Sequence, residues 1–387
     1  MLSKKTRFIL LLILIPVIYC GFMASASAFT TTQESGVYSI ATEETVEPIT
    51  PTAKTISTRG KNVYNWSALD QALGSFVPGE VNGLTFILSK DGQILYEKAL
   101  GNQSIDSFLP IASSSKVPSA VVILTLVQEG LLDLDKPIST YLQGHINWPS
   151  DKASITIRML LNHTSGLQSY PFCLNRRRET LKECAQEIAN APLEFTPGTK
   201  FAYGGGSFQV AGYVAEVVSD KSWNDLFHER LAAPLGLEKF TYSGGTLGSD
   251  TNPRIAGGAS STAYDYIKIL QMILSNRNYN PEVFVLSPEI IKMMSTSQIA
   301  GLPIVSSPAE DYLLPGYSFG FWISDPSIHP ASNGPELSNP GALGCTPWVD
   351  FDLDYSAVLL IRANTSKGMD IWDTIRPIII RELTVTK

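Results

Sequence analysis

Cysteine and histidine are scarce in this sequence, which holds four of each among its 387 residues. Four cysteines are too few for a disulfide-dense miniprotein, and no two of them form a C-x-x-C pair. The sequence does not predict a metal site, because no H-E-x-x-H motif occurs and the histidines are scattered: His145, His163, His228 and His329.

Signatures of several other protein classes are also missing. There is no phosphate-binding loop and no dinucleotide fingerprint, so we expect no cofactor. The G-x-S-x-G elbow of the α/β-hydrolases does not occur either. Lysine and arginine form no basic stripe and the formal net charge is −7, which argues against a nucleic-acid partner.

The first 28 residues have the pattern of a secretory signal peptide. Basic residues precede an apolar run at 8–22, and small residues at 24–28 offer a cleavage site after Ala28. An uncleaved membrane anchor is the alternative interpretation. We expect export to the periplasm or to the outside of the cell. No later stretch is long and apolar enough to span a membrane, so we expect no span after cleavage.

Residues 29–61 are rich in Thr, Ser, Pro and Glu and are predicted to form a disordered linker. The folded domain is predicted at 62–387. It begins with two strands, at 84–88 and 94–100, on either side of the hairpin signal Asp91-Gly92. Further strands are predicted at 346–349 and 355–362, and helices at 117–132, 157–161, 181–191, 208–218, 263–274 and 371–383. This order predicts an α/β fold, with an antiparallel sheet built from both chain ends, flanking helices and a large helical insertion.

Ser113-Ser114-Ser115-Lys116 opens the most apolar of the predicted helices. Because Ser113 and Lys116 are three residues apart, they share one face of a first helical turn. A buried lysine is driven toward its neutral form and can accept a proton from a serine, which makes Ser113 a candidate nucleophile. The alternative interpretation is a capping serine followed by a lysine that reaches solvent.

Seven segments, in this order along the chain, resemble the beta-lactamase-related serine hydrolases: PIASSSK at 110–116, LLDLDKP at 131–137, ITIRMLLNHTSGL at 155–167, FTPGTKFAY at 195–203, AGGASSTA at 256–263, NPGALG at 339–344 and WVD at 348–350. This superfamily joins class C beta-lactamases, D-Ala-D-Ala carboxypeptidases, D-aminopeptidases and related esterases. The resemblance implies a beta-lactamase/transpeptidase-like fold and gives His163 a supporting role in that fold.

The second motif of this superfamily is Tyr-x-Asn, and here it reads Tyr203-Gly204-Gly205. The resemblance implies that Tyr203 is the general base or the proton donor beside Ser113, and we expect a cationic Lys116 to lower its pKa. Gly205 stands at the Asn position, so one side-chain hydrogen bond to the substrate or to Lys116 is lost. A buried structural tyrosine is the alternative.

The third motif, Lys-Thr-Gly or His-x-Gly, aligns with Asn339-Pro340-Gly341. The resemblance implies that Gly341 lets the backbone approach the substrate and that the N–H of Ala342 joins Ser113 as an oxyanion donor. Asn339 can form hydrogen bonds but carries no charge. We therefore expect neutral esters and amides rather than the carboxylate-bearing beta-lactams and peptidoglycan stems.

The cysteines at 173 and 184 are separated by 11 positions across a polar segment. Since export would place the chain in an oxidising compartment, we expect a Cys173–Cys184 disulfide that staples an exposed excursion. Two free thiols are the alternative. Cys345 is then left over, and we expect it to be a small core residue.

Two functions stay open at this point. The intact set of Ser113, Lys116 and Tyr203 favours a secreted serine hydrolase that forms an acyl-enzyme, an esterase more than a beta-lactamase or D,D-peptidase. Gly205 and Asn339 favour a non-catalytic binding protein that keeps the fold. In both cases we expect a small-molecule or peptide-like ligand.

Overall fold

The computed structural model describes residues 64–242, 249–276, 285–309, 314–324 and 336–385. The predicted signal peptide at 1–28 and the predicted linker at 29–61 lie outside these residues. In the part that is described, no helix has both the length and the hydropathy needed to cross a bilayer.

A seven-stranded antiparallel sheet forms the centre of the domain. Its order is β2 (Gln93–Gly101), β1 (Gly83–Lys90), β12 (Tyr355–Ile361), β11 (Thr346–Asp350), β10 (Glu336–Ser338), β9 (Trp322–Ile323) and β8 (Gly316–Tyr317). The first strand of the chain therefore pairs with the last, from Leu84 opposite Ile361 to Lys90 opposite Tyr355. This arrangement confirms the predicted sheet built from both chain ends.

The predicted hairpin joins β1 and β2. Asp91 and Gly92 have φ angles of +50° and +74°, and two left-handed residues in succession give the turn twist that suits a two-residue hairpin. The side chains of β12 alternate between two cores. Tyr355, Ala357 and Leu359 belong to one of them, and Val358 and Leu360 belong to the other.

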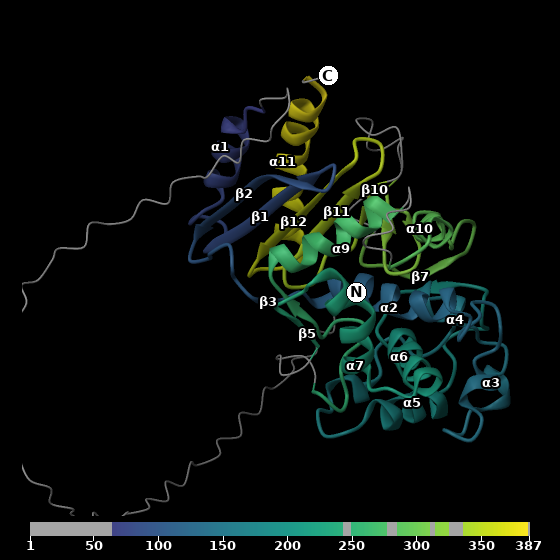
Figure 1. Cartoon of the computed structure of the whole chain (residues 1–387). Coiled ribbons are helices and arrows are strands. Elements are labelled where there is room, and N and C mark those ends of the chain that lie inside the picture. Colours follow the sequence, from purple (N-terminus) through teal and green to yellow (C-terminus); the bar gives the residue numbers. More distant parts are fainter. Residues whose placement is uncertain (1–63, 243–248, 277–284, 310–313, 325–335, 386–387) are drawn as a thin grey trace, which may run out of the picture. The chain divides into compact units, whose positions relative to one another are not determined.

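Helices α1 (Ser67–Ser75) and α11 (Thr365–Val385) cover one face of the sheet, and α9 (Ala263–Asn276) packs on the other (Figure 1). The helical insertion lies beyond α9. Its helices are α2 (Lys116–Gln128), α3 (Ser139–Leu142), α4 (Ile157–Leu161), α5 (Leu181–Asn190), α6 (Gly206–Ser219), α7 (Trp223–Phe227), α8 (Ala233–Leu235) and α10 (Pro288–Met294). Its short strands are β3 (Leu109–Pro110), β4 (Phe201–Ala202), β5 (Phe240–Thr241), β6 (Ser260–Ser261) and β7 (Ile304–Ser306).

Helix α2 is the central helix of the insertion. Each residue from Lys116 to Leu126 is buried, as its apolar sequence predicts. The helix ends at Gln128, four residues before the predicted end at 132. Gly130, with a φ of +76°, turns the chain away from the helical path.

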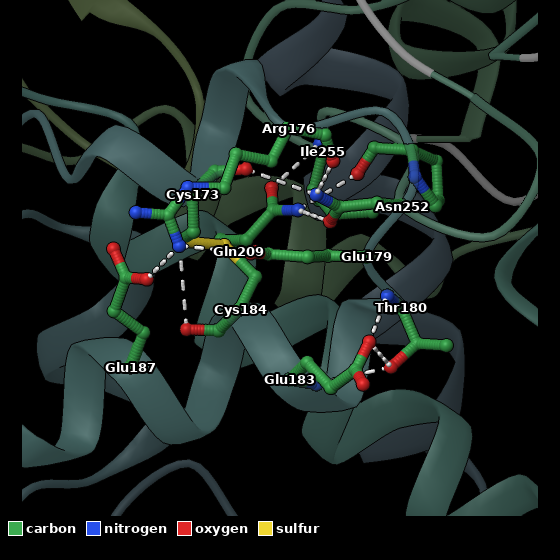
Figure 2. The surroundings of a disulfide bond; sticks show 11 residues. Cys173, Arg176, Glu179, Thr180, Glu183, Cys184, Glu187, Gln209, Asn252 and Ile255 are labelled. Carbon is green, nitrogen blue, oxygen red and sulfur yellow. Dashed lines mark hydrogen bonds and ion pairs between the residues drawn. A yellow bond between two sulfur atoms is a disulfide. The ribbon is translucent and has the colours of Figure 1, made fainter.

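The predicted disulfide between Cys173 and Cys184 is formed, and Cys345 is free and buried, as expected. The excursion between them is exposed as expected, since most of residues 175–182 are exposed, whereas the two bonded cysteines are fully buried in the core of the helical insertion. The polar residues between them that predicted exposure face away from this core, whereas the disulfide ties the 3₁₀ turn 172–175 to α5 (Figure 2).

Candidate active site

A cavity of about 440 Å³ contains Ser113, Lys116 and Tyr203 in its wall. Gly205 and Ala342 also line it, so five of the seven residues predicted for the site meet in one place. Asn339 and Gly341 are not among the described residues that line the cavity.

Ser113 lies in a 3₁₀ turn, Ala112–Ser115, that leads directly into α2 at Lys116. In a 3₁₀ turn the side chains of residues i and i+3 are eclipsed, which aligns Ser113 with Lys116 more closely than an α-helix would. The Lys116 Nζ lies 3.4 Å from the Ser113 Oγ. Ala112, just before the serine, has a φ of +47°, a left-handed conformation that is uncommon outside glycine.

Lys116 is 2% exposed. Its Nζ donates to the Ala256 carbonyl at 2.9 Å and stands 4.4 Å from the centre of the Tyr203 ring. No ion pair joins it to a carboxylate in the described part of the chain. Burial, and then the positive charge of Arg254, lower its pKa to about 7. A large fraction of Lys116 is therefore a neutral amine near pH 7.

Tyr203 is buried, and its ring packs on Trp322 and His163 with ring centres 5.2 and 4.8 Å apart. Burial raises the pKa of Tyr203, so the lowering expected from Lys116 is wrong. A hydrogen bond from the Ser113 side chain acts to lower the pKa of the Tyr203 hydroxyl. The desolvation of a buried phenolate outweighs the hydrogen bond, and Lys116 itself is poorly charged in this environment.

His163 does not line the cavity but supports the ring of Tyr203 from behind. It is 1% exposed, and its Nε2 is 3.1 Å from the Tyr317 hydroxyl. Burial lowers its pKa well below the ordinary value, so the imidazole stays neutral. This placement agrees with a supporting role.

The space beside Gly205, where the motif carries an asparagine elsewhere, is occupied by the end of the Leu174 side chain. A Cβ at this position would lie 2.8 Å from Leu174 Cδ1, and Leu174 belongs to the turn held by the disulfide. The N–H of Gly205 donates to the Ser169 carbonyl at 2.7 Å. An apolar side chain thus occupies the place of an amide in this wall of the cavity.

Asn339 and Gly341 are where the site prediction needs correction. The side chain of Asn339 is fully buried and donates to the Gly320 carbonyl, away from the cavity. Gly341 does allow a close approach, but the group that approaches it is the backbone of Ile111 and not a substrate. The Ile111 carbonyl would collide with a Cβ at position 341. The segment that holds Asn339 and Gly341 packs closely on Ile111, just before Ser113, and this packing keeps the two residues out of the cavity wall. The residue that follows Gly341 lines the cavity instead.

That next residue, Ala342, lines the cavity beside Ser113. Among the described residues, no acceptor is found for the backbone N–H of Ser113 or of Ala342. Two free N–H groups beside a nucleophile can stabilise the oxyanion of a tetrahedral intermediate. The arrangement as a whole can support nucleophilic attack, proton transfer and oxyanion stabilisation.

Arg254 is a cavity residue that the sequence reasoning missed. Its position two residues before the Ala256-Gly257-Gly258 segment was a signal, because that segment belongs to the motifs that converge on the site. The side chain of Gln209 holds the backbone around it, donating to the carbonyl of Pro253 and accepting from the N–H of Ile255. Figure 2 shows Gln209 beside Asn252, which it also contacts.

Asn252 connects this segment to the disulfide. Its side-chain amide donates to the carbonyls of Cys173 and Arg176, both at 3.0 Å (Figure 2). Arg176 in turn pairs with Glu179 and Glu187. The disulfide turn and the segment that carries Arg254 and Ala256 are therefore positioned by one hydrogen-bonded network.

A family model described as Beta-lactamase matches residues 69–376. Among curated proteins, Penicillin-binding protein 4 of Amycolatopsis lactamdurans is 28% identical over 170 residues, which cover 43% of each chain. Protein flp of Staphylococcus aureus (strain MW2) is 25% identical over 176 residues, covering 42% of this chain and 35% of that protein. The chain thus spans less than half the length of these curated relatives.

Solved structures share the fold over most of the chain. A candidate beta-lactamase from Bacteroides dorei DSM 17855 is 27% identical with a TM-score of 0.71, over 81% of this chain and 99% of that one. EstCE1, a hydrolase with promiscuous acyltransferase activity, has a TM-score of 0.65 at 19% identity, over 82% and 99%. The beta-lactamase/transpeptidase-like α/β fold predicted from the motifs is confirmed.

Proposed function

This chain belongs to the beta-lactamase family, and we propose that it is a serine hydrolase that cleaves esters or amides through an acyl-enzyme on Ser113. The observation that carries the proposal is the meeting of Ser113, a buried Lys116 and Tyr203 in one cavity. Its ligand is a small-molecule or peptide-like substrate, in keeping with a cavity of this size.

In the first half of the reaction, the Ser113 Oγ attacks the carbonyl carbon of the substrate. Neutral Lys116 takes the serine proton, and the backbone N–H groups of Ser113 and Ala342 hold the oxyanion. The tetrahedral intermediate then collapses, and the bond to the leaving group breaks. The leaving oxygen or nitrogen takes the proton back from Lys116, through the hydroxyl of Tyr203.

In the second half, a water molecule attacks the carbonyl of the acyl-enzyme and gives its proton to Lys116. The bond to Ser113 Oγ breaks, and the serine recovers that proton as the carboxylic acid product leaves. Tyr203 acts as a neutral proton donor and acceptor here, which suits a phenol whose pKa is raised by burial.

Within this function we propose a preference for esters over beta-lactams and D,D-peptides. Leu174 fills the space beside Gly205 where relatives place an amide side chain, so a substrate amide loses a hydrogen-bonding partner. Asn339 carries no charge and is turned away from the cavity. An ester needs fewer polar contacts than an amide, and its leaving group requires less assistance from a proton donor.

Export remains part of the proposal. The signal-peptide pattern at 1–28, followed by the linker-like composition at 29–61, supports a secreted or periplasmic location. A disulfide within the domain is compatible with an oxidising compartment. N-terminal sequencing of the processed protein would test cleavage after Ala28, and an intact N-terminus on the exported chain would contradict it.

The alternative is a binding protein without catalysis. A fluorophosphonate probe separates the two functions, because only an activated serine is labelled covalently. We expect labelling of the wild type and none of Ser113→Ala, with hydrolysis of p-nitrophenyl esters lowered by orders of magnitude. Ser114→Ala is the matched control: its hydroxyl is buried on the Asn339 carbonyl, and its removal should leave labelling intact. Normal turnover by a folded Ser113→Ala protein would contradict the proposal.

A further inference from the structure

Arg254 is, with Lys116, one of two cations among the described residues that line the cavity. Its side chain is only partly exposed, yet no hydrogen bond or ion pair joins its guanidinium to a described residue. Four other arginines each pair with a carboxylate: Arg158, Arg176, Arg230 and Arg376. A partly desolvated guanidinium without a partner costs the fold stability, and an anionic ligand would offset that cost.

The backbone around Arg254 is firmly held, whereas its side chain has no partner among the described residues. Gln209 is fully buried and forms hydrogen bonds on both sides of Arg254, at 2.9 Å to Pro253 and 3.1 Å from Ile255. The Arg254 carbonyl accepts from the N–H groups of Gly257 and Gly258 at 3.1 and 2.7 Å. A guanidinium on such a fixed support is presented to the cavity from a defined position.

The charge of the cavity differs in sign from that of the chain. The whole sequence has a formal net charge of −7, whereas the described lining of the cavity holds Lys116 and Arg254 and no aspartate or glutamate. Since Lys116 is largely neutral near pH 7, the Arg254 guanidinium is the main source of positive potential in this described lining, and apolar surroundings strengthen it. The described part of the cavity lining therefore favours a substrate that brings a negative charge.

We propose that Arg254 is a specificity-determining residue that binds a carboxylate on the ester substrate. A guanidinium can bind a carboxylate through two parallel hydrogen bonds, which gives orientation as well as attraction. The proposal rests on the hydrolase function proposed above, and it replaces the neutral esters expected from Asn339 by esters that carry a carboxylate. In this chain the substrate carboxylate would be bound by Arg254, a residue of the helical insertion. In relatives, the position that aligns with Asn339 carries a cation.

The test compares kcat/KM for pairs of esters that differ by one charge. For a carboxylate on the acyl group, the pair is the p-nitrophenyl monoester of adipic acid and its methyl-capped diester. For a carboxylate on the leaving group, the pair is para-acetoxybenzoate and its methyl ester. We expect the wild type to prefer the anionic member of at least one pair, and that pair reports which part of the substrate faces Arg254.

In Arg254→Gln, the ratio of anionic to neutral kcat/KM should fall about 10-fold or more for the preferred pair, the loss typical of a charge-assisted hydrogen bond. Arg381→Gln is the charge control, because it removes the same charge from an exposed position on α11 and should keep the ratio. Arg254→Lys retains the charge without the two parallel hydrogen bonds, so it should keep part of the preference. If Arg254→Gln does not fold, Arg254→Lys replaces it as the test variant, and a partial loss of the charge preference is then the expected result.

A wild type without charge preference in either pair, or a preference that Arg254→Gln leaves unchanged, would overturn the subsite while the hydrolase function stands. Failure of the hydrolase function looks different, since no ester of either charge would then be cleaved and Ser113 would not be acylated. In that case calorimetric binding of adipate to the full chain still tests the subsite. Binding by the wild type that is lost in Arg254→Gln supports it, and equal binding or none overturns it.

Discussion

Acylation of Ser113 should follow the neutral fraction of Lys116. Burial, with a smaller effect of Arg254, lowers the Lys116 pKa from 10.5 to about 7. About half of the amine is then neutral at pH 7, against about one molecule in 3,000 for an unperturbed lysine. Since the neutral amine takes the serine proton, the acylation rate should rise with pH to a midpoint near 7 and level off above it.

The assay is the burst of p-nitrophenol from p-nitrophenyl acetate, followed in a stopped-flow instrument from about pH 5 to 9. Lys116→Arg keeps a cation that does not deprotonate, so it should lose acylation by orders of magnitude at every pH. Arg254→Gln should move the midpoint upward, because the Arg254 charge contributes to the lowered pKa. A flat profile, a midpoint near the ordinary lysine value or an active Lys116→Arg variant would refute the assignment.

The same pKa shift has a consequence for stability. The unfolded chain binds one more proton than the folded chain between about pH 7 and 10.5, so Lys116 makes stability rise with pH in that window. Removing the amine in Lys116→Met should gain about 5 kcal/mol at pH 7, because folding lowers the Lys116 pKa from 10.5 to about 7. It loses about 1–3 kcal/mol from the Ala256 carbonyl left without a donor. We expect a net gain of about 2–4 kcal/mol in urea unfolding, in an inactive protein.

Three further predictions concern residues around the site and the sheet. Asn339→His should not improve the turnover of carboxylate-bearing esters, because this side chain is turned away from the cavity; a selective gain in kcat/KM would contradict that placement. Asp350→Asn should flatten the loss of stability that we expect as the pH rises from about 4.5 to 7. Burial, and then the nearby Asp350, raise the Glu336 pKa to about 7 despite its ion pair with Arg376. Between about pH 4.5 and 7 the folded chain therefore holds a proton on Glu336 that the unfolded chain has lost, so stability falls as the pH rises through this window. Urea unfolding at pH 5 and 8 measures the difference. Replacing Cys173 and Cys184 by alanine should cost about 2–3 kcal/mol in urea unfolding and lower activity as well, whereas unchanged activity would separate the disulfide from the network that positions the site.

The sequence was informative wherever a local pattern determines local structure. The Asp91-Gly92 turn and the apolar runs of α2 and β12 each specify their element through near neighbours. The S-x-x-K spacing located Ser113 and Lys116 for the same reason. Motif order then brought Tyr203 into the same cavity, although it is 90 positions away from Ser113.

The sequence was uninformative where a side chain's role depends on what packs against it. Asn339 aligned with a substrate-facing position, but Gly320 accepts its hydrogen bond, and no local pattern predicts that contact. The direction of the Tyr203 pKa shift depends on burial by Trp322 and His163, which come from distant segments. Arg254 escaped notice because its lack of a partner among the described residues can be seen only once the neighbouring chain segments are in place.

The pairing of β1 with β12 affects the order in which the domain can form. Leu84 of β1 and Ile361 of β12 are partners, so a growing chain has to produce nearly the whole domain before β1 finds its second neighbour in the sheet. Closing so long a loop raises the contact order and slows folding. A chain that stops before Tyr355 leaves the inner edge of β1 exposed, even though every residue of the cavity except Thr365 precedes that position. Premature termination near the C-terminus should therefore yield a protein that holds the catalytic serine, lysine and tyrosine but aggregates through an open strand edge.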